Sequence, residues 1–179
     1  MLRGIVPGGS AVEEGRLILS VQAASTALAP AAMGARVVAF IVDGIVVIIL
    51  QSVIGSIVPD ATIIGGLTRA IILAVIGFGY FAYSWTAWRA SPGQRIFGLV
   101  TVNAADASTL NWSQAAKRWA FLFGPGVLSS LFQFSGVSAI VALLAILYAV
   151  YLLYTAATDP LNQGFHDKQA GTLVAMKTG

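Results

Sequence analysis

The stretch Val37–Val58, with the sequence VVAFIVDGIVVIILQSVIGSIV, decides the class of the fold. Asp43 and Gln51 are its only strongly polar residues, and Pro59 follows it directly. A helix needs about 20 mainly apolar residues to cross a bilayer. The stretch therefore predicts a transmembrane helix that ends before Pro59.

The composition of the whole chain indicates that lipid covers much of its surface. Hydrophobic residues make up 58% of the 179 residues and charged residues only 9%, whereas about 25% of a typical soluble domain is charged. The formal net charge is +3, but the ten basic residues are spread along the chain and form no cluster. We therefore expect the lipid bilayer, and not a nucleic acid, as the main partner.

Three further apolar stretches complete the predicted bundle. Ala70–Trp88 and Val137–Thr158 are each long enough to cross a bilayer. Trp119–Phe134 is shorter and is interrupted by Gly124-Pro125-Gly126, which favours a kinked crossing or a re-entrant segment. The expected fold is an all-α membrane protein with about four transmembrane helices, of which the third is short and broken.

The distribution of basic residues predicts the orientation. With four crossings, nine of the ten basic residues fall on one side of the membrane, and only Arg69 falls on the other. Lys and Arg are enriched in cytoplasmic loops. We therefore expect both termini, the loop of residues 89–118 and the tail of residues 159–179 to be cytoplasmic. The nine residues are Arg3, Arg16, Arg36, Arg89, Arg95, Lys117, Arg118, Lys168 and Lys177.

Short runs with strand character lie in the cytoplasmic pieces. The runs are Arg16–Gln22, which alternates in polarity, Leu99–Asn103, which is rich in β-branched residues, and Thr172–Met176. They predict a small cytoplasmic sheet beside the helices, with loops in the headgroup region as the alternative. Residues 1–33 are then an N-terminal cytoplasmic segment with a possible strand, and residues 34–179 form the transmembrane domain.

Three motifs, in the same order, resemble those of the RDD family of bacterial membrane proteins, which is named for one arginine and two aspartates. Residues 35–43, ARVVAFIVD, resemble the opening of that family. Residues 91–102, SPGQRIFGLVTV, are similar to its glycine-basic-glycine loop and the strand after it, and residues 165–174, FHDKQAGTLV, resemble its closing motif. The resemblance covers about residues 34–177 and implies a protein of the bacterial inner membrane.

The resemblance also implies which residues form the site. The named residues of the family correspond to Arg36, Asp43 and Asp167, and Arg118 matches a basic residue that often follows the loop. Two neighbours in the motifs, Arg95 and His166, are expected to support them. The family is mostly of unknown function, and a transport role has been suggested for it without a defined ligand.

The spacing of the charged residues points to a physical role. Arg36 and Asp43 are seven residues apart, which is about two helical turns and roughly 10 Å of rise, so their side chains share a helix face. A carboxylate within the membrane is costly and is expected to face protein, water or a cation. We expect another partner for Asp43, and a pair between Arg36 and Asp167 that ties the tail to the first helix. The charges are interpreted as a folding clamp, with an ion or proton path as the alternative.

No catalytic site and no metal site are expected. His166 is the only histidine and the chain has no cysteine, so a zinc site is not predicted. No nucleophile motif accompanies His166 and Asp167, as acid–base catalysis would require. Gly93 and Gly98 favour a tight turn and close packing against Arg95 over a phosphate-binding loop, because no lysine-serine pair follows them.

Three tyrosines recur along the last apolar stretch, at Tyr148, Tyr151 and Tyr154. Such a stripe favours packing against neighbouring helices or lipid over stacking on a pigment or quinone. No cofactor is identifiable from the sequence, and bound lipid is expected.

The sequence favours a small protein without enzymatic activity. We expect it to act as an accessory or structural subunit, packed in a larger membrane assembly or against its own copies. Its small size, long apolar surfaces and sparse polar interior favour this function. The alternative is a transporter of ions, protons or small solutes that uses the intramembrane Asp43.

Overall fold

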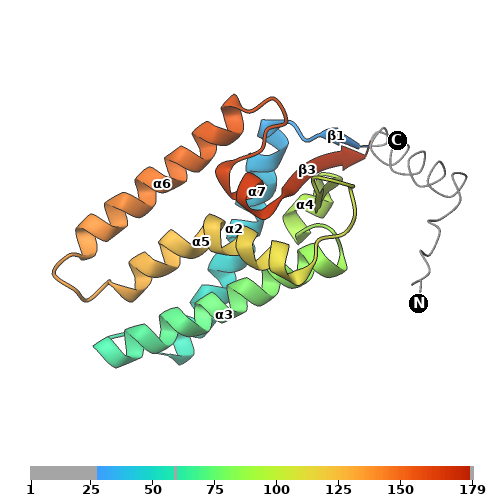
Figure 1. Ribbon diagram of the computed structural model, residues 1–179. Coiled ribbons are helices and arrows are strands. Elements are labelled where there is room, and N and C mark those ends of the chain that lie inside the picture. The colour runs from blue at the N-terminus through green and yellow to red at the C-terminus, as the bar shows by residue number, and fades with distance from the viewer. Residues whose placement is uncertain (1–27, 59, 178–179) are drawn as a thin grey trace, which may run out of the picture.

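The computed structural model describes residues 28–58 and 60–177 (Figure 1). The predicted strand Arg16–Gln22 lies outside these residues. The elements in chain order are β1 (Leu28–Pro30), α2 (Met33–Ile57), α3 (Ile63–Ala87), α4 (Pro92–Ile96), β2 (Leu99–Asn103), α5 (Trp112–Leu131), α6 (Ser138–Thr158), α7 (Phe165–Ala170) and β3 (Thr172–Lys177).

The three longest apolar stretches form the long helices that the sequence predicts. Within the described residues, α2, α3 and α6 are long and apolar enough to cross a membrane. α3 begins seven residues before the predicted crossing, because Thr62 caps it by accepting a hydrogen bond from the backbone N–H of Gly65 at 3.0 Å. Arg69 therefore lies inside α3, where it pairs with Asp60 at 2.6 Å.

The stretch Trp119–Phe134, predicted to be broken at Gly124-Pro125-Gly126, is continuous with the helix before it up to Leu131. α5 is one helix of 20 residues that contains Pro125. Proline has no backbone N–H, so it leaves the carbonyl of the residue four positions earlier without its helical partner. That carbonyl belongs to Phe121, and the hydroxyl of Tyr148 in α6 donates a hydrogen bond to it at 2.7 Å. A neighbouring helix thus satisfies the backbone group that the proline frees.

A small antiparallel sheet has the strand order β1-β3-β2. Two predicted strands are confirmed as β2 and β3, which pair from Leu99 opposite Met176 to Asn103 opposite Thr172. The other strand is β1, which the sequence did not predict and which places Pro30 opposite Ala175. Proline is tolerated there because β1 is an edge strand.

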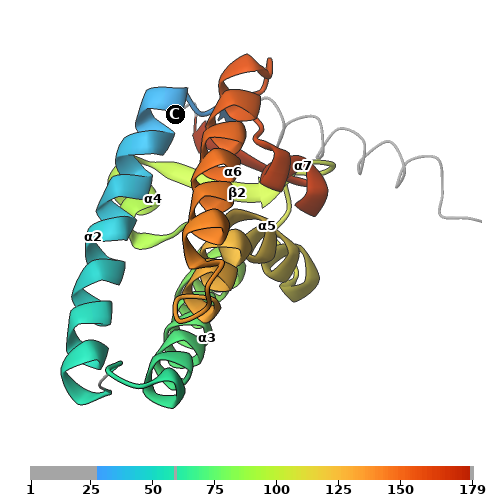
Figure 2. The same ribbon diagram turned by 90° about the vertical axis from the view of Figure 1, so that its left-hand side faces the viewer.

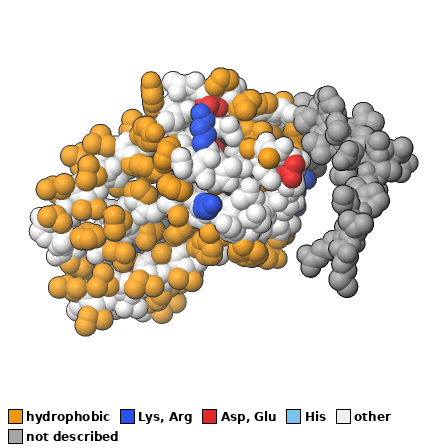
Figure 3. Space-filling model, in the orientation of Figure 1, with side chains coloured by type: hydrophobic (Ala, Val, Ile, Leu, Met, Phe, Trp, Pro, Cys, Tyr) orange, Lys and Arg blue, Asp and Glu red, His pale blue; other side chains and the backbone are white. Residues whose placement is uncertain are grey.

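The sheet, α4 and α7 lie together at one end of the long helices (Figure 1). We call this end the sheet end and the opposite end, which carries the α2–α3 and α5–α6 connections, the far end. In Figure 3, charged side chains gather over the sheet end, whereas hydrophobic side chains dominate the visible face of the helices. This division is the one expected for a helical bundle in lipid with a polar cap.

The best-packed part of the bundle lies between α3 and α5. Its buried cluster consists of Phe81, Ala82, Trp85, Leu110 and Ala115. α2 buries only Ala39 and Asp43, and α6 buries only Leu152 and Ala156. α2 packs mainly on α4, and Figure 2 shows it on one side of the molecule, apart from α6.

Candidate functional site

Asp167 is the centre of a buried charge network at the sheet end. It occupies the third position of α7, is fully buried, and accepts a hydrogen bond from the backbone N–H of Gly164 at 3.0 Å. Its Oδ2 also accepts from Nη2 of Arg36 at 2.5 Å, and its Oδ1 accepts from Nη1 of Arg118 and from the hydroxyl of Thr172. One carboxylate therefore joins α2, α5, α7 and β3.

The two guanidinium groups of this network are themselves well held. Arg36 also donates to the backbone carbonyl of Asn162. Arg118 donates to the hydroxyl of Thr172 at 2.8 Å, and its guanidinium lies over the ring of Trp85 at 4.9 Å. An arginine over an indole face gains a cation–π attraction, so Arg118 is fixed between an aromatic ring and a carboxylate.

The charges of the network fix the protonation of Asp167 and His166. Burial alone raises the pKa of Asp167, but the guanidinium groups of Arg118 and Arg36 outweigh it and hold the pKa well below its ordinary value. Burial lowers the pKa of His166 to about 4, although Asp167, whose Oδ2 lies 3.4 Å from its Nε2, acts in the opposite direction. At neutral pH Asp167 is therefore ionised and His166 is uncharged.

Asp43 is the centre of a second network, in the middle of α2. Its Oδ1 accepts from the hydroxyl of Tyr80 in α3 at 3.0 Å and from the backbone N–H of Gly93 at 2.8 Å. Its Oδ2 accepts from the hydroxyl of Ser91 at 2.5 Å. The first N–H groups of a helix lack partners within the helix, so Asp43 completes the N-terminus of α4 from outside. It thereby joins α2, α3 and α4.

Gly93 lets α4 approach α2 closely enough for this contact. A Cβ atom at Gly93 would lie 2.2 Å from the backbone carbonyl oxygen of Ala39 and 2.9 Å from the carboxylate of Asp43. Both distances are too short for a side chain. The sequence predicted close packing of Gly93 against Arg95, whereas the observed close contact is with α2, about which the local sequence says nothing.

The structure separates the predicted charged residues into two groups. Arg36, Arg118 and His166 gather at Asp167, whereas Asp43 has its own partners and makes no bond to Arg36 in the described part of the chain. Arg95 joins neither group; it is exposed and lies over the ring of Trp88 at 5.5 Å. The charged cluster is therefore two networks linked through α2.

Sequence reasoning missed the uncharged partners. Those that bond to the charged groups are Tyr80, Ser91, Asn162, Gly164 and Thr172. One local signal existed for Ser91: a serine, a proline and, three residues after the serine, a glutamine form the capping box that begins α4. The first N–H groups of a helix need a hydrogen-bond acceptor, but the sequence alone does not identify Asp43 as that acceptor.

A cavity of about 280 Å³, which we call the sheet-end cavity, adjoins both networks. Its polar lining comes from Arg36, Asp43, Ser91, Gln94, Arg118 and His166. Apolar side chains of α2, α3, α5 and α6 form the rest of its wall. The candidate residues, apart from Asp167 and Arg95, thus border one space.

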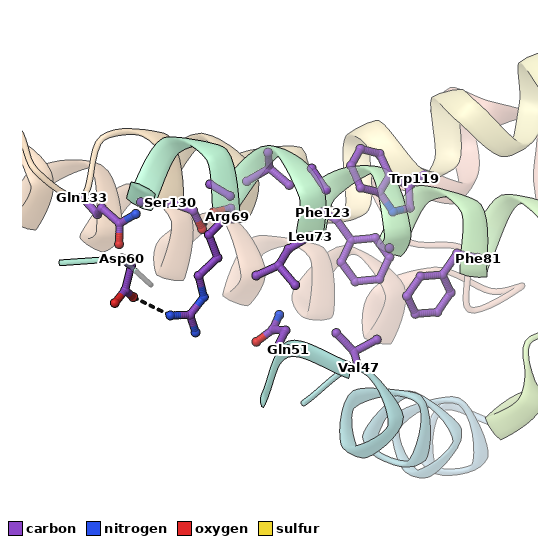
Figure 4. A pocket seen from close by; sticks show the side chains of 16 residues that line it. Val47, Gln51, Asp60, Arg69, Leu73, Phe81, Trp119, Phe123, Ser130 and Gln133 are labelled. Carbon is purple, nitrogen blue, oxygen red and sulfur yellow. Dashed lines mark hydrogen bonds and ion pairs between the residues drawn. The ribbon is translucent and has the colours of Figure 1, made fainter. Parts of the chain in front are cut away.

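A second cavity of about 420 Å³ lies nearer the far end, between α2, α3 and α5; we call it the far-end cavity (Figure 4). Figure 4 shows Arg69 reaching toward Asp60 at one end and Trp119 and Phe123 at the other. Its polar lining comes from Gln51, Asp60, Arg69, Ser130 and Gln133. Phe81 lines both cavities, so this one ring stands between them.

Neither network has the composition of a metal centre. Within residues 28–58 and 60–177, no group of three or more His, Asp or Glu side chains converges on a point where a metal ion could be held. Each carboxylate is surrounded by hydrogen-bond donors, which compete with a cation for its oxygen atoms. The arrangement is suited to holding elements together.

Comparison with known proteins gives one family. The model of the RDD family matches residues 30–171, which is well over half of the chain and includes every residue of the two networks except Thr172. No curated protein and no solved structure matches the chain. The resemblance read from the three motifs is thus confirmed, and the chain belongs to the RDD family of membrane-associated bacterial proteins.

Proposed function

We propose that this RDD protein is a non-enzymatic subunit of a membrane assembly, built with other membrane proteins or with its own copies, and that its charged motif is a structural clamp. One observation carries the proposal: both oxygen atoms of Asp43 and of Asp167 are engaged by donors of the chain itself. A carboxylate used in this way holds elements in place and is not free to bind a passing ion.

We also propose that the chain crosses the bacterial inner membrane four times, with the sheet end on the cytoplasmic side. α5 has 20 residues, so it is about 30 Å long, and its apolar part follows Lys117 and Arg118 toward the far end. It also connects two apolar helices and packs against both α3 and α6. The basic residues favour this orientation. The elements that meet at the sheet end, or the residues next to them, carry Arg36, Arg89, Arg95, Lys117, Arg118 and Lys168, whereas Arg69 lies near the start of α3, next to the α2–α3 connection.

The surfaces of α2 and α6 support a role in assembly. Both helices present long rows of exposed apolar side chains, such as Ile48 and Ile49 on α2 and Leu144 and Leu147 on α6. Packing between membrane helices depends on close side-chain contact, and these rows stay exposed although α2 packs on α4 and α6 packs on α5. They are therefore the surfaces we assign to partner helices.

The chain has no cysteine, which allows a direct test. Single variants Ile49→Cys and Leu144→Cys place a thiol on α2 or α6, and oxidative cross-linking in native membranes should trap a dimer or a conjugate with another membrane protein. Mild purification followed by mass spectrometry would identify the conjugate. Leu110→Cys, at a buried position, is the matched control and should not cross-link. Recovery of the wild-type protein as a lone monomer, with no cross-link from either helix, would contradict the proposal.

A second candidate function is transport of ions, protons or small solutes, and one observation favours it. The two cavities lie toward opposite ends of the bundle and Phe81 borders both, as a closed apolar gate would. The test is flux through reconstituted vesicles that contain pH-sensitive and sodium-sensitive dyes. Phe81→Ala should raise flux, and Asp43→Asn should lower it. If the wild-type protein, Phe81→Ala and Asp43→Asn all give the same flux as empty vesicles, this function is excluded.

A further inference from the structure

The sheet-end cavity lies where two membrane helices fail to close against each other. Its side walls are α2 and α6, which make no extensive contact in the described part of the chain. α3 and α5 form its floor through Phe81, Trp85, Arg118 and Leu122. The space between α2 and α6 thus faces the hydrocarbon region from the side of the bundle.

Two buried hydrogen-bond donors on this floor have no acceptor. Trp85 is 1% exposed and Arg118 is 3% exposed, and both line the cavity. Nε1 of Trp85 and Nε of Arg118 each lack a hydrogen-bond partner. Both atoms can only donate, and leaving such a group unpaired in the interior costs about 1–3 kcal/mol. The missing partner is therefore a group with acceptor oxygens.

The remainder of the wall is apolar. Val37 and Phe40 of α2 face Leu152 and Leu153 of α6 across the cavity. A wall of this kind suits an extended hydrocarbon chain, which can enter the cavity of about 280 Å³ from the side of the bundle.

The depth of the donors matches the boundary of a bilayer. Arg118 lies in the second turn of α5, and Trp85 lies one turn before the end of α3. Both are thus near the sheet end, at the level where indole and guanidinium groups meet lipid headgroups. Ester and phosphate oxygens of a phospholipid lie at this level, and the acyl chains extend from there toward the far end.

We propose that the sheet-end cavity binds one phospholipid, with an acyl chain between α2 and α6 and an ester or phosphate oxygen accepting hydrogen bonds from Trp85 and Arg118. Arg36, Arg118 and Asp43 line the cavity, and Asp167, outside the lining, pairs with both arginines, so the charges of the two networks balance. Recognition then rests on oxygen acceptors and the hydrocarbon chain, and phosphatidylethanolamine and phosphatidylglycerol should bind alike. The site does not depend on whether the protein is a subunit or a transporter.

Fluorescence quenching provides the test, because Trp85 is shielded from bulk lipid. A variant with Trp88→Phe, Trp112→Phe and Trp119→Phe keeps Trp85 as its only tryptophan, and it is reconstituted into vesicles of phospholipid with brominated acyl chains. We expect strong quenching relative to vesicles of unbrominated lipid. Ala149→Phe, at the cavity wall on α6, should remove most of it, whereas Ala157→Phe, on the same helix but outside the cavity, should not. Equal Trp85 emission in both kinds of vesicle would overturn the proposal.

Native mass spectrometry of protein extracted in mild detergent gives a second readout that needs no triple variant. The wild-type protein should retain one phospholipid, and Ala149→Phe should lose it. Trp85→Phe keeps an aromatic ring but removes Nε1, and we expect it to bind about fivefold more weakly, as the loss of one hydrogen bond of about 1 kcal/mol implies. Retention that is the same for wild-type protein and Ala149→Phe would also overturn the site.

Discussion

Arg36, in the first turn of α2, donates a hydrogen bond to Asp167, which lies 131 residues later in α7. Arg118 reaches the same carboxylate from α5. Because a single buried carboxylate faces two guanidinium groups, removing it leaves more unbalanced charge than removing either arginine. The two kinds of substitution should therefore have unequal effects.

Asp167→Asn should lower the free energy of unfolding by about 3–5 kcal/mol, as expected when one partner of a buried ion pair is removed. Arg36→Gln should cost less, since Arg118 still faces Asp167, and the double variant should cost less than the sum of the two. Thermal melting in detergent measures each value. Arg95→Gln, at an exposed residue outside both networks, is the control and should change little. Strict additivity of the two losses would argue against a direct pair.

Gly93→Ala should destabilise the protein by about 1–3 kcal/mol, the usual cost of forcing extra volume into a packed site. The added methyl group meets the carbonyl of Ala39 and the carboxylate of Asp43, so α4 must move away from α2. Gly79→Ala is the matched control, because a Cβ there meets nothing within 4 Å and alanine favours a helix interior. Melting curves of the two variants should shift in opposite directions or by clearly different amounts.

Tyr148→Phe should cost roughly 1 kcal/mol, the usual size of one hydrogen bond between membrane helices. The loss should shrink in a Pro125→Ala background, where residue 125 regains its N–H and can bond to the carbonyl of Phe121. Tyr154→Phe, at a side chain that is 65% exposed, serves as the control. If the cost of Tyr148→Phe is the same with Pro125 and with alanine at that position, the bond to Phe121 is not what stabilises the helix pair.

His166 should make the stability depend on pH between about 4 and 6.5. The unfolded chain takes up a proton at the ordinary histidine pKa of 6.5, whereas the folded protein takes it up only near pH 4, so protons favour unfolding across this range. The folded state should lose up to about 3 kcal/mol as the pH falls from 6.5 to 4. Melting should show this slope in the wild-type protein and a flatter profile in His166→Gln. Asp167 adds its own loss only below its unfolded pKa of 3.8.

Cysteine labelling should place α5 across the membrane. Asp106→Cys, in the turn after β2, should react with a membrane-impermeant maleimide only after permeabilisation. Gly136→Cys, in the α5–α6 connection with open space around its Cβ, should react in intact spheroplasts. Reaction of both positions from the same side would show that α5 does not cross.

The elements that depend on local sequence were predictable. Runs of apolar residues predicted α2, α3 and α6, β-branched residues predicted β2, and the short run Thr172–Met176 predicted β3. β1 was not predictable, because it has three residues, includes Pro30, and forms only by pairing with β3 from the other end of the described chain. The continuity of α5 through Pro125 depends on Tyr148 in another helix, and no local pattern around Pro125 shows it.

In the site, too, the residues found by local motifs were predictable, whereas the contacts set by tertiary packing were not. Motifs identified Arg36, Asp43 and Asp167, and the Arg36–Asp167 contact follows from placing both at the same membrane boundary. The separation of Asp43 from Arg36 depends on Ser91 and Gly93, which reach it only because α4 docks on α2. That docking is a tertiary contact, so residue spacing within α2 alone could not reveal it.

The clamp also sets an order of events during synthesis. Arg36 and Arg118 leave the ribosome before Asp167, and β1 leaves it before its partner β3. The membrane helices must therefore insert while both guanidinium groups still lack their carboxylate and are held in the headgroup region. A chain released before α7 is made retains every long helix and the Asp43 network, but it lacks the carboxylate that joins α2 to α5 and leaves Arg36 and Arg118 without their shared partner.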